Sequence, residues 1–342
     1  MKQILFPPEW HTQSAIQLTW PHEDSDWDYM LEEITACYLS IAREILKRQK
    51  LLIVCKNPAA VEYALGSGFP SGNLRLIEIA SNDTWSRDHA PLTVFIDKQP
   101  ALYDFTFNGW GLKFRADLDN QISRCLFAAR VFSRQTLYRN MKGFVLEGGS
   151  IETDGQGALL TTSRCLLSPN RNPHLSKAEI EAYLKEIFGL KRVLWLDYGY
   201  LAGDDTDSHI DTLARFCDER TIAYVCCDDP KDEHFDALRQ MEEQLKSFVD
   251  FEGNPYRLIP LPMAEKIVFD GERLPATYAN FLIINGAVLV PAYQTPKDED
   301  AVRLLSDAFP DREIVSLDCR PLVKQHGALH CIAMQYPDGV IS

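Results

Sequence analysis

The sequence has nine cysteines but contains no Cys-x-x-Cys pair. Structural zinc sites and thioredoxin-like redox centres are commonly built on that spacing, so we expect neither here. Most of the cysteines lie in apolar helix or strand patterns and should be small core residues. Those six are Cys37, Cys55, Cys125, Cys217, Cys226 and Cys227. Cys331 differs from them because small residues precede it, in Gly327-Ala328-Leu329-His330.

The chain also has fewer basic than acidic residues. The chain has 35 Lys and Arg against 49 Asp and Glu, a formal net charge of -14. Because phosphate binding needs clustered Lys and Arg, this balance disfavours nucleic acids and anionic membranes as partners, whereas a small cationic substrate is compatible with it. No apolar run approaches transmembrane length, and Pro7, Pro8 and Glu9 stand where a signal peptide would be apolar. We therefore expect a cytoplasmic protein.

No Gly/Ser linker or low-complexity segment divides the 342 residues. Helical periodicity runs from Asp28 to Lys50, with Met30, Ile34, Cys37, Ile41 and Ile45 on one apolar face. Further helices are expected to start near Asn57, Asp119, Ser176, Asp232 and Asp298. The helix at Ser176 has a capping box with Glu179 and should end at Gly189. These starts recur about every 60 residues, with two or three extended segments between them, which favours radial repetition of a small α/β unit. Two α+β domains divided near Asn172 are the alternative.

Four aspartates and one histidine crowd into Gly203 to Asp211, which reads Gly-Asp-Asp-Thr-Asp-Ser-His-Ile-Asp. Such crowding is costly unless a cation binds there, although a solvated acidic turn is the simpler interpretation. A calcium loop is disfavoured because the glycine and glutamate of an EF-hand are missing. Ile210 to Phe216 is predicted as a strand, so His209 and Asp211, two residues apart, should face the same way.

Two other polar segments interrupt or follow apolar strands. Asn82 to Pro91 follows a predicted strand and contains Arg87 and Asp88, which form a local structural pair or part of a site. Glu147-Gly148-Gly149-Ser150 interrupts the predicted strand Phe144 to Ile151. Its glycines would admit a ligand, another backbone or a bulge, and Glu147 is expected to be a buried carboxylate that needs a partner.

A free cysteine such as Cys331 is more often a core residue than a nucleophile, but together with His209 it fits thiol catalysis. Carboxylates nearby would oppose a developing oxyanion, whereas they suit a cationic electrophile such as a guanidinium. Asp88 and Asp211 would then hold the cation. His209 would protonate the departing nitrogen and later activate water. The same carboxylates should raise the pKa of Cys331 in the empty enzyme.

Short motifs in collinear order resemble the agmatine deiminase family, which is related to bacterial peptidylarginine deiminases within the guanidino-group-modifying superfamily. The motifs are Trp20-Pro21, Trp85-Ser86-Arg87-Asp88, Phe107-Asn108-Gly109-Trp110-Gly111, Glu147-Gly148-Gly149, Gly203 to Asp211, Ala214-Arg215-Phe216, Asn280-Phe281, Asn285-Gly286, Pro291-Ala292-Tyr293 and His330-Cys331-Ile332. The resemblance covers nearly the whole chain. It implies an α/β fold, a five-bladed, pseudo-symmetric α/β propeller of the pentein type, with residues 1–342 forming a single deiminase domain of about five ββαβ units.

The resemblance also implies roles for individual residues. Cys331 would be the nucleophile and His209 the general acid and base, oriented by Glu147. Asp88 and Asp211 would bind the guanidinium, as the residue chemistry already suggested. Trp85 and Trp110 resemble walls of the substrate channel, and Asp205, or failing that Asp207, would contact the distal ammonium. Ser208 stands where the family usually has glycine. No cofactor or metal is implied.

The implied reaction converts agmatine and water to N-carbamoylputrescine and ammonia through a thiouronium intermediate on Cys331, in putrescine and polyamine biosynthesis. Deimination of protein or peptidyl arginine is the alternative substrate class. A metal-dependent hydrolase using His209 and Asp211, and a guanidine-binding protein without turnover, are alternatives of other classes. The sequence leaves open whether the protein forms a homodimer.

Overall fold

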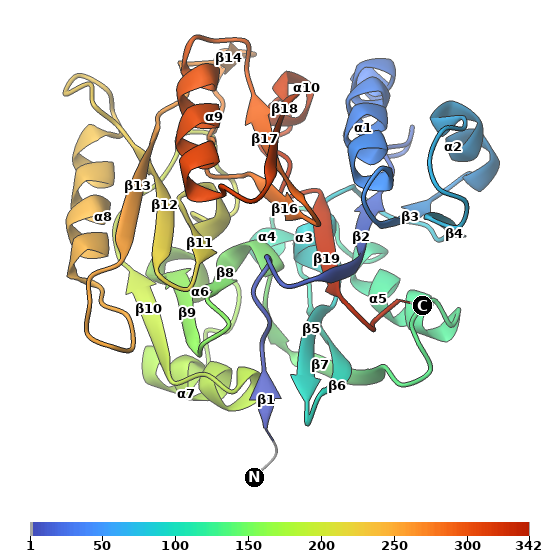
Figure 1. Ribbon diagram of the computed structural model, residues 1–342, viewed down its shortest axis with the longest axis horizontal. Helices are drawn as coiled ribbons and strands as arrows, with labels where there is room; N and C mark the ends of the chain where they lie inside the picture. The colour runs from blue at the N-terminus through green and yellow to red at the C-terminus, as the bar shows by residue number, and fades with distance from the viewer. Residues whose placement is uncertain (1–2, 342) are drawn as a thin grey trace.

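The computed structural model describes residues 3–341, and the fold is mixed α/β as expected. The ends of the predicted 1–342 domain, residues 1–2 and 342, lie outside the described residues. Within residues 3–341 the strands form five sheets of three or four strands and one two-stranded sheet. Figure 1 shows the longer helices at the periphery, with α3 (Ser86–His89) and β19 (Ala333–Pro337) nearer the middle.

Four of the larger sheets have the same construction. In each, an antiparallel strand pair leads into a helix, and the next strand returns parallel to the second strand of the pair. The four units are β5 (Leu92–Ile96), β6 (Gln99–Thr106), α5 (Asp119–Ala128), β7 (Leu137–Val145); β8 (Ile151–Thr153), β9 (Ala158–Thr162), α7 (Lys177–Phe188), β10 (Arg192–Leu196); β11 (Ala214–Asp218), β12 (Thr221–Cys226), α8 (Phe235–Ser247), β13 (Arg257–Pro262); and β16 (Leu282–Ile284), β17 (Ala287–Ala292), α9 (Lys297–Ala308), β18 (Glu313–Asp318).

The remaining large sheet joins the two ends of the chain. β19 pairs antiparallel with β2 (Gln13–Thr19), and β2 pairs parallel with β3 (Lys50–Cys55) across α1 (Leu31–Leu46). β4 (Leu74–Glu78) then extends the sheet. Cys331 lies two residues before β19, so this pairing brings the predicted nucleophile next to segments from the start of the chain.

Shorter elements connect the units. They are β1 (Ile4–Leu5), which pairs with β5; the β14 (Val268–Phe269) and β15 (Glu272–Arg273) pair; the helices α2 (Pro58–Leu65), α4 (Gly109–Leu112), α6 (Ser163–Leu166) and α10 (Arg320–Val323); and the 3-10 turns η1 (Asp28–Met30), η2 (Gly148–Ser150) and η3 (Ile210–Thr212). No helix within residues 3–341 is both long and apolar enough to cross a membrane.

Local capping signals predicted several helices correctly. The Ser176 side chain accepts a hydrogen bond from the Glu179 backbone, and the Glu179 carboxylate accepts one from the Ser176 backbone. This reciprocal cap starts α7, which ends where Gly189 takes a left-handed φ of 68°. Asn57 likewise caps α2 through the Ala60 backbone N–H. The helix predicted from Asp28 to Lys50 is shorter, because a 3-10 turn precedes α1 and the helix ends at Leu46.

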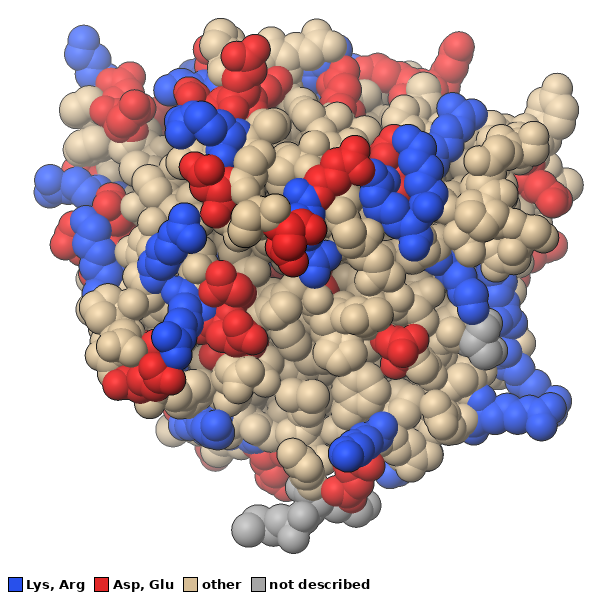
Figure 2. All heavy atoms as spheres, viewed as in Figure 1, with Lys and Arg blue, Asp and Glu red and all other residues tan. Residues whose placement is uncertain are grey.

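The core consists of the apolar faces of the sheets and helices. On α1 the residues predicted to face inward, Ile34, Cys37, Ile41 and Ile45, are all buried. Of the six cysteines assigned to the core, Cys125 and Cys226 are only half-buried and the other four are buried. Acidic and basic side chains are interspersed on the face drawn in Figure 2.

The predicted strand from Ile210 to Phe216 is wrong. Residues Ile210–Thr212 form the 3-10 turn η3, and the strand β11 begins only at Ala214. The Thr212 hydroxyl donates to the His209 carbonyl, a local bond that favours a turn over an extended strand. Two-residue alternation therefore does not explain how His209 and Asp211 are oriented. The predicted strand Phe144 to Ile151 is likewise divided, by η2.

A domain boundary near Asn172 would separate β9 from β10. These two strands pair in parallel over five residues of each. The Asn172 side chain also bridges to the Val145 backbone through two hydrogen bonds of 3.0 and 2.9 Å. The structure therefore gives no support to two domains divided at this point.

Candidate active site

One cavity contains five of the residues singled out from the sequence: Trp85, Asp88, Trp110, Asp205 and Cys331. Its empty volume is about 470 Å³. The other lining residues are Asp26, Asp83, Phe114, Thr206, Thr212, Gln325, His326 and Gly327. Among the described residues that line it there is no lysine or arginine, whereas four aspartates do, so the cavity suits a cation.

Cys331 is fixed by the side chain of Asn280. The amide oxygen of Asn280 accepts hydrogen bonds from the backbone N–H of His330 at 3.0 Å and of Cys331 at 3.3 Å. It also lies 3.4 Å from Cys331 Sγ, while Asp211 Oδ2 is 3.9 Å from the same sulfur. The Asn280 amide nitrogen donates to the Asp211 backbone oxygen. Asn280 therefore joins the turn of the thiol to the turn of the predicted guanidinium ligand.

Burial raises the pKa of the Cys331 thiol well above its usual value, and the carboxylates of Asp211 and Asp88 raise it further. The direction agrees with the sequence prediction, but burial is the larger cause. Without a bound cation this thiol is protonated at neutral pH.

Gly149 is the point at which three predicted catalytic side chains converge. A Cβ atom at this position would lie 2.6 Å from His209 Nδ1, 2.9 Å from Asp88 Oδ1 and 3.1 Å from Asp211 Oδ2. Only glycine leaves room for all three. The Gly149 backbone N–H donates to Asp88 Oδ1 at 2.9 Å, and Trp110 Nε1 donates to Asp88 Oδ2 at 2.8 Å. These two donors fix the Asp88 carboxylate at the cavity wall.

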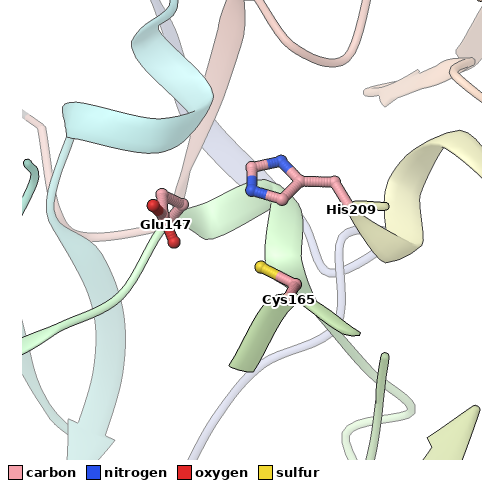
Figure 3. A group of neighbouring side chains, drawn as sticks. All are labelled: Glu147, Cys165 and His209. Atoms are coloured by element: carbon pink, nitrogen blue, oxygen red, sulfur yellow. The ribbon is translucent and has the colours of Figure 1, made fainter. Parts of the chain in front are cut away.

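His209 lies behind this wall, with Nδ1 3.7 Å from Asp88 Oδ1. Burial lowers the pKa of His209, but the negative charges of Asp88 and Glu147 and the thiol of Cys165 outweigh it and raise the pKa well above its usual value. The raised pKa favours the protonated ring, which can serve as an acid first. Figure 3 shows its ring beside Glu147 and Cys165, which come from two other segments.

Glu147 is fully buried and does have a partner, Arg171, which the sequence analysis did not single out. Arg171 Nε donates to both carboxylate oxygens, at 3.0 and 2.9 Å. The other nitrogens of the guanidinium donate to Asp207 Oδ2 at 2.6 Å and to the Thr206 carbonyl at 2.8 Å. Glu147 is thus near His209, but its hydrogen bonds anchor the acidic run through Arg171.

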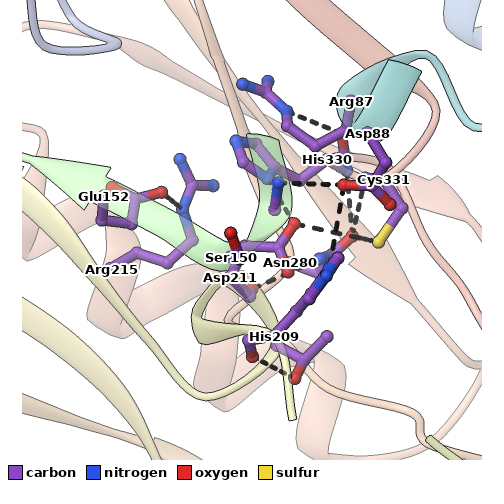
Figure 4. Close-up of polar contacts among 12 residues, drawn as sticks. Arg87, Asp88, Ser150, Glu152, His209, Asp211, Arg215, Asn280, His330 and Cys331 are labelled. Carbon is purple, nitrogen blue, oxygen red and sulfur yellow. Dashed lines mark hydrogen bonds and ion pairs between the residues drawn. The ribbon is translucent and has the colours of Figure 1, made fainter. Parts of the chain in front are cut away.

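Asp211 is held from behind by His330, as Figure 4 shows. His330 Nδ1 is 2.7 Å from Asp211 Oδ2, and His330 Nε2 is 2.6 Å from Glu9 Oε2. His330 therefore links the predicted guanidinium ligand Asp211 to Glu9. Arg215 lies 2.8 Å from the same Glu9 oxygen and also pairs with Glu152. A buried layer of alternating charges therefore supports the site.

The two oxygens of Asp211 differ in their partners. Burial raises the pKa of Asp211, but its hydrogen bond from His330 and the charge of that ring outweigh this and lower the pKa. Within residues 3–341, the buried Oδ1 atom has no hydrogen-bond partner. An ionised carboxylate oxygen without a donor is an acceptor for a bound guanidinium.

The aspartates of the acidic run have different roles. Asp204 accepts from the backbone N–H groups of Thr206 and Ser208 and shapes the loop. Asp207 is paired, with Lys113 at 2.8 Å and with Arg171 at 2.6 Å. Asp205 lines the cavity, and burial raises its pKa to about 6, an effect that nearby His326 opposes. Of the two candidates for the distal ammonium, only Asp205 reaches the cavity.

Five residues of this region carried no predicted role: Glu9, Cys165, Arg171, Asn280 and His330. Asn280 and His330 stood inside motifs that the sequence analysis quoted, so their place in the order of motifs was a usable signal. Glu9 and its partner Arg215 are separated by 206 residues, which no local pattern can reveal.

Comparison with known proteins agrees with these features. A model of the Porphyromonas-type peptidyl-arginine deiminase family matches residues 5–337. An agmatine deiminase from Medicago truncatula is 33% identical over 361 residues, covering 97% of this chain and 96% of the relative.

Two solved structures are similar over almost the whole chain. A Porphyromonas gingivalis protein described as a candidate arginine deiminase is 52% identical, with a TM-score of 0.95, over 99% of this chain and 100% of that one. A cysteine-to-serine variant of C. jejuni agmatine deiminase with substrate bound is 39% identical, with a TM-score of 0.92, over 99% and 97%. The chain therefore belongs to the Porphyromonas-type peptidyl-arginine deiminase family, as its motifs predicted.

Proposed function

We propose that the protein is an agmatine deiminase, a hydrolase of the C–N bond of a linear amidine, which converts agmatine and water to N-carbamoylputrescine and ammonia in putrescine biosynthesis. One observation carries the proposal: the Cys331 thiol, the His209 ring and the carboxylates of Asp88 and Asp211 converge beside a cavity that is lined by four aspartates. The agmatine deiminases among its relatives supply the substrate.

Binding exchanges charge between the substrate and the site. Asp211 and Asp88 would each accept two N–H groups of the planar guanidinium. Burial raises the pKa of Asp88, so the arriving cation favours its ionised form. The same positive charge favours the Cys331 thiolate, whose proton leaves to solvent. Cys331 and the guanidinium carbon are then held together in an orientation that supports attack.

The chemical steps use His209 twice. Thiolate attack forms the S–C bond, His209 gives its proton to one terminal nitrogen, and the C–N bond breaks to release ammonia. The product of this half-reaction is a thiouronium on Cys331. Neutral His209 then takes a proton from water, and the hydroxide adds to the same carbon. The S–C bond then breaks as the added hydroxyl forms the carbonyl and loses its proton to solvent, which releases the carbamoylated amine and restores the thiolate.

The far end of the cavity favours an amine over an amino acid. Asp205 would accept from the distal ammonium, and the rings of Trp85 and Trp110 would cover the methylene chain. The α-carboxylate of free arginine would need a cationic partner, and no lysine or arginine is found among the described lining residues. Peptidyl arginine has no free α-carboxylate, so it stays the alternative substrate class.

The test is ammonia release with agmatine, free arginine and an arginyl peptide at equal concentrations, with C331A as the control. Agmatine should give the largest kcat/KM, and C331A should release no ammonia while its circular dichroism stays native. A larger kcat/KM with the peptide would transfer the assignment to peptidylarginine deimination. Turnover that needs a metal, lost with chelation and restored by the ion, would instead favour a metal-dependent hydrolase.

For the architecture, we propose that the five repeated units form one domain and a five-bladed propeller. The shared strand order of the five sheets and the β19 to β2 pairing, which joins the chain ends, support this. The cytoplasmic location and the homodimer stay predictions, as does the absence of nucleic-acid partners.

A further inference from the structure

Glu147, Cys165 and His209 form a cluster of possible metal ligands, and the deimination mechanism does not use them as ligands. Each contributes one candidate ligand atom, and these atoms lie within 4.8 Å of one another. All three residues are buried, with Glu147 and Cys165 fully so and His209 1% exposed. Figure 3 shows the three side chains directed toward a common point from separate segments.

One atom of this cluster has no partner. Among the described residues, nothing satisfies the hydrogen-bonding requirement of His209 Nε2, although the atom is buried. The comparison with a second cluster, Glu9, Glu152 and His330, is informative. There both ring nitrogens of His330 contact carboxylates, and Arg215 pairs with both glutamates. Glu147 is likewise paired, with Arg171, so the first cluster differs in its open Nε2 atom and in its thiol.

Carboxylate, thiol and imidazole are the ligand types that zinc prefers. Tetrahedral zinc holds N, O and S ligands about 3.3 to 3.7 Å apart, so side-chain movements of roughly 1 Å would bring these atoms into range. We propose that Glu147, Cys165 and His209 form an inhibitory zinc site. Binding would release the thiol proton of Cys165 and the Nε2 proton of His209 to solvent, and water would complete the coordination.

The carboxylates of Glu147 and Asp88 flank the His209 ring and would attract a divalent cation once the ring proton has left. Arg171 is the nearby positive group, and it is shared between Glu147 and Asp207. Asp88 lies against the other ring nitrogen of His209 and lines the cavity. The Cys165 thiolate formed on binding adds a further negative charge.

The expected consequence is loss of activity, which rests on the proposed role of His209. Zinc on Nε2 would leave Nδ1 protonated, but this neutral, metal-bound ring is a far weaker acid than an imidazolium and has no free nitrogen that could take a proton from water. Zinc should therefore inhibit ammonia release, and a chelator should restore it. This is opposite to the behaviour of a metal-dependent hydrolase, whose activity a chelator would abolish.

Binding is tested without turnover in the C331A variant, which removes the other reactive thiol. Cobalt(II) serves as the probe, because a Co–thiolate bond gives a near-ultraviolet charge-transfer band. C331A should bind one equivalent with this band. C331A/C165S, with an isosteric side chain that is a poor ligand, should weaken the affinity about 100-fold or more and lose the band. C331A/C217A, which changes another buried cysteine, is the matched control and should bind normally.

Competition with zinc for the bound cobalt then gives the zinc affinity. Equal affinity for cobalt in C331A and C331A/C165S, or no thiolate band in C331A, would overturn the proposal. Native circular dichroism of both double variants keeps a folding defect separate from a lost ligand. If C331A still releases ammonia, the proposed function fails, while the cobalt result continues to decide the zinc site.

Discussion

Replacement of Gly149 by alanine should disable the active site with little effect on the rest of the fold. The added Cβ would lie 2.6 Å from His209 Nδ1 and 2.9 Å from Asp88 Oδ1, both closer than such contacts occur in proteins. Gly149 is not among the glycines with positive φ, so alanine meets no backbone strain there. The effect should therefore come from displacement of the catalytic side chains.

The magnitude follows from those distances. Ordinary contact with a Cβ begins near 3.4 Å, so His209 or the backbone must move by about 0.8 Å. Misplacement of reacting groups by about 1 Å costs roughly 100-fold in rate. Overpacking of a full site costs about 1 to 3 kcal/mol of stability, which a protein of this size can absorb. We expect kcat for agmatine to fall about 100-fold or more in a folded protein.

The assay is steady-state ammonia release, with urea unfolding to measure stability. Gly143 is the matched control, because a Cβ there meets nothing within 4 Å and its φ is not positive. G143A should keep the wild-type kcat. The reasoning is refuted if G149A turns over agmatine at the wild-type rate, or if G143A loses as much activity as G149A.

Three further predictions concern charge. D205N should raise KM for agmatine about 10- to 100-fold with a small change in kcat, because a charge-assisted hydrogen bond contributes about 1.5 to 3 kcal/mol. Asp207 is already paired, so a larger increase of KM in D207N would contradict the assignment of Asp205 to the distal ammonium. In the substrate-free enzyme, the difference in absorbance between wild type and C331A should show no thiolate at pH 7, because burial and Asp211 raise the pKa of Cys331. A full thiolate signal would contradict this prediction. E9Q should lower the free energy of unfolding in urea by about 3 to 5 kcal/mol, because it removes one of the two carboxylates paired with the buried Arg215. Burial raises the pKa of Glu9, but Arg215 and His330 outweigh it and hold the pKa well below its usual range. The stabilisation by Glu9 is therefore present above the unfolded-state pKa of about 4.3 and is lost as the pH falls below that value. E9Q should lack this acid-dependent loss of stability, and a pH profile of stability identical to that of the wild type would contradict the prediction.

Signals that act over a few residues made much of the fold predictable. The Ser176 and Glu179 cap fixed the start of α7, and Gly189 fixed its end, because both act within one helical turn. The strand predicted across Asp211 failed because the hydroxyl of Thr212 bonds locally to the His209 carbonyl, which an apolar pattern does not reveal.

The residues of the candidate site could be predicted from the sequence, but the partners that hold their side chains in place could not. Asp88, His209, Asp211 and Cys331 were identified from their chemistry and motif order, and they do converge near Gly149 and Asn280. The partners that hold them could not be predicted, since Arg171 and Glu147 are 24 residues apart and His330 and Glu9 are 321 apart. The sequence also could not show which aspartate of the acidic run is free. Asp207 is not free, because Lys113, a residue distant in the sequence, pairs with it.

The account depends most on a covalent bond between Cys331 and the substrate carbon. Rapid acid quenching of the enzyme during turnover of agmatine, followed by intact-protein mass spectrometry and peptide mapping, measures that bond directly. The predicted result is an adduct of the mass of agmatine less ammonia on the peptide that contains Cys331, with no adduct in C331A. Ammonia release by C331A, or an adduct mapped to another residue, would contradict the account.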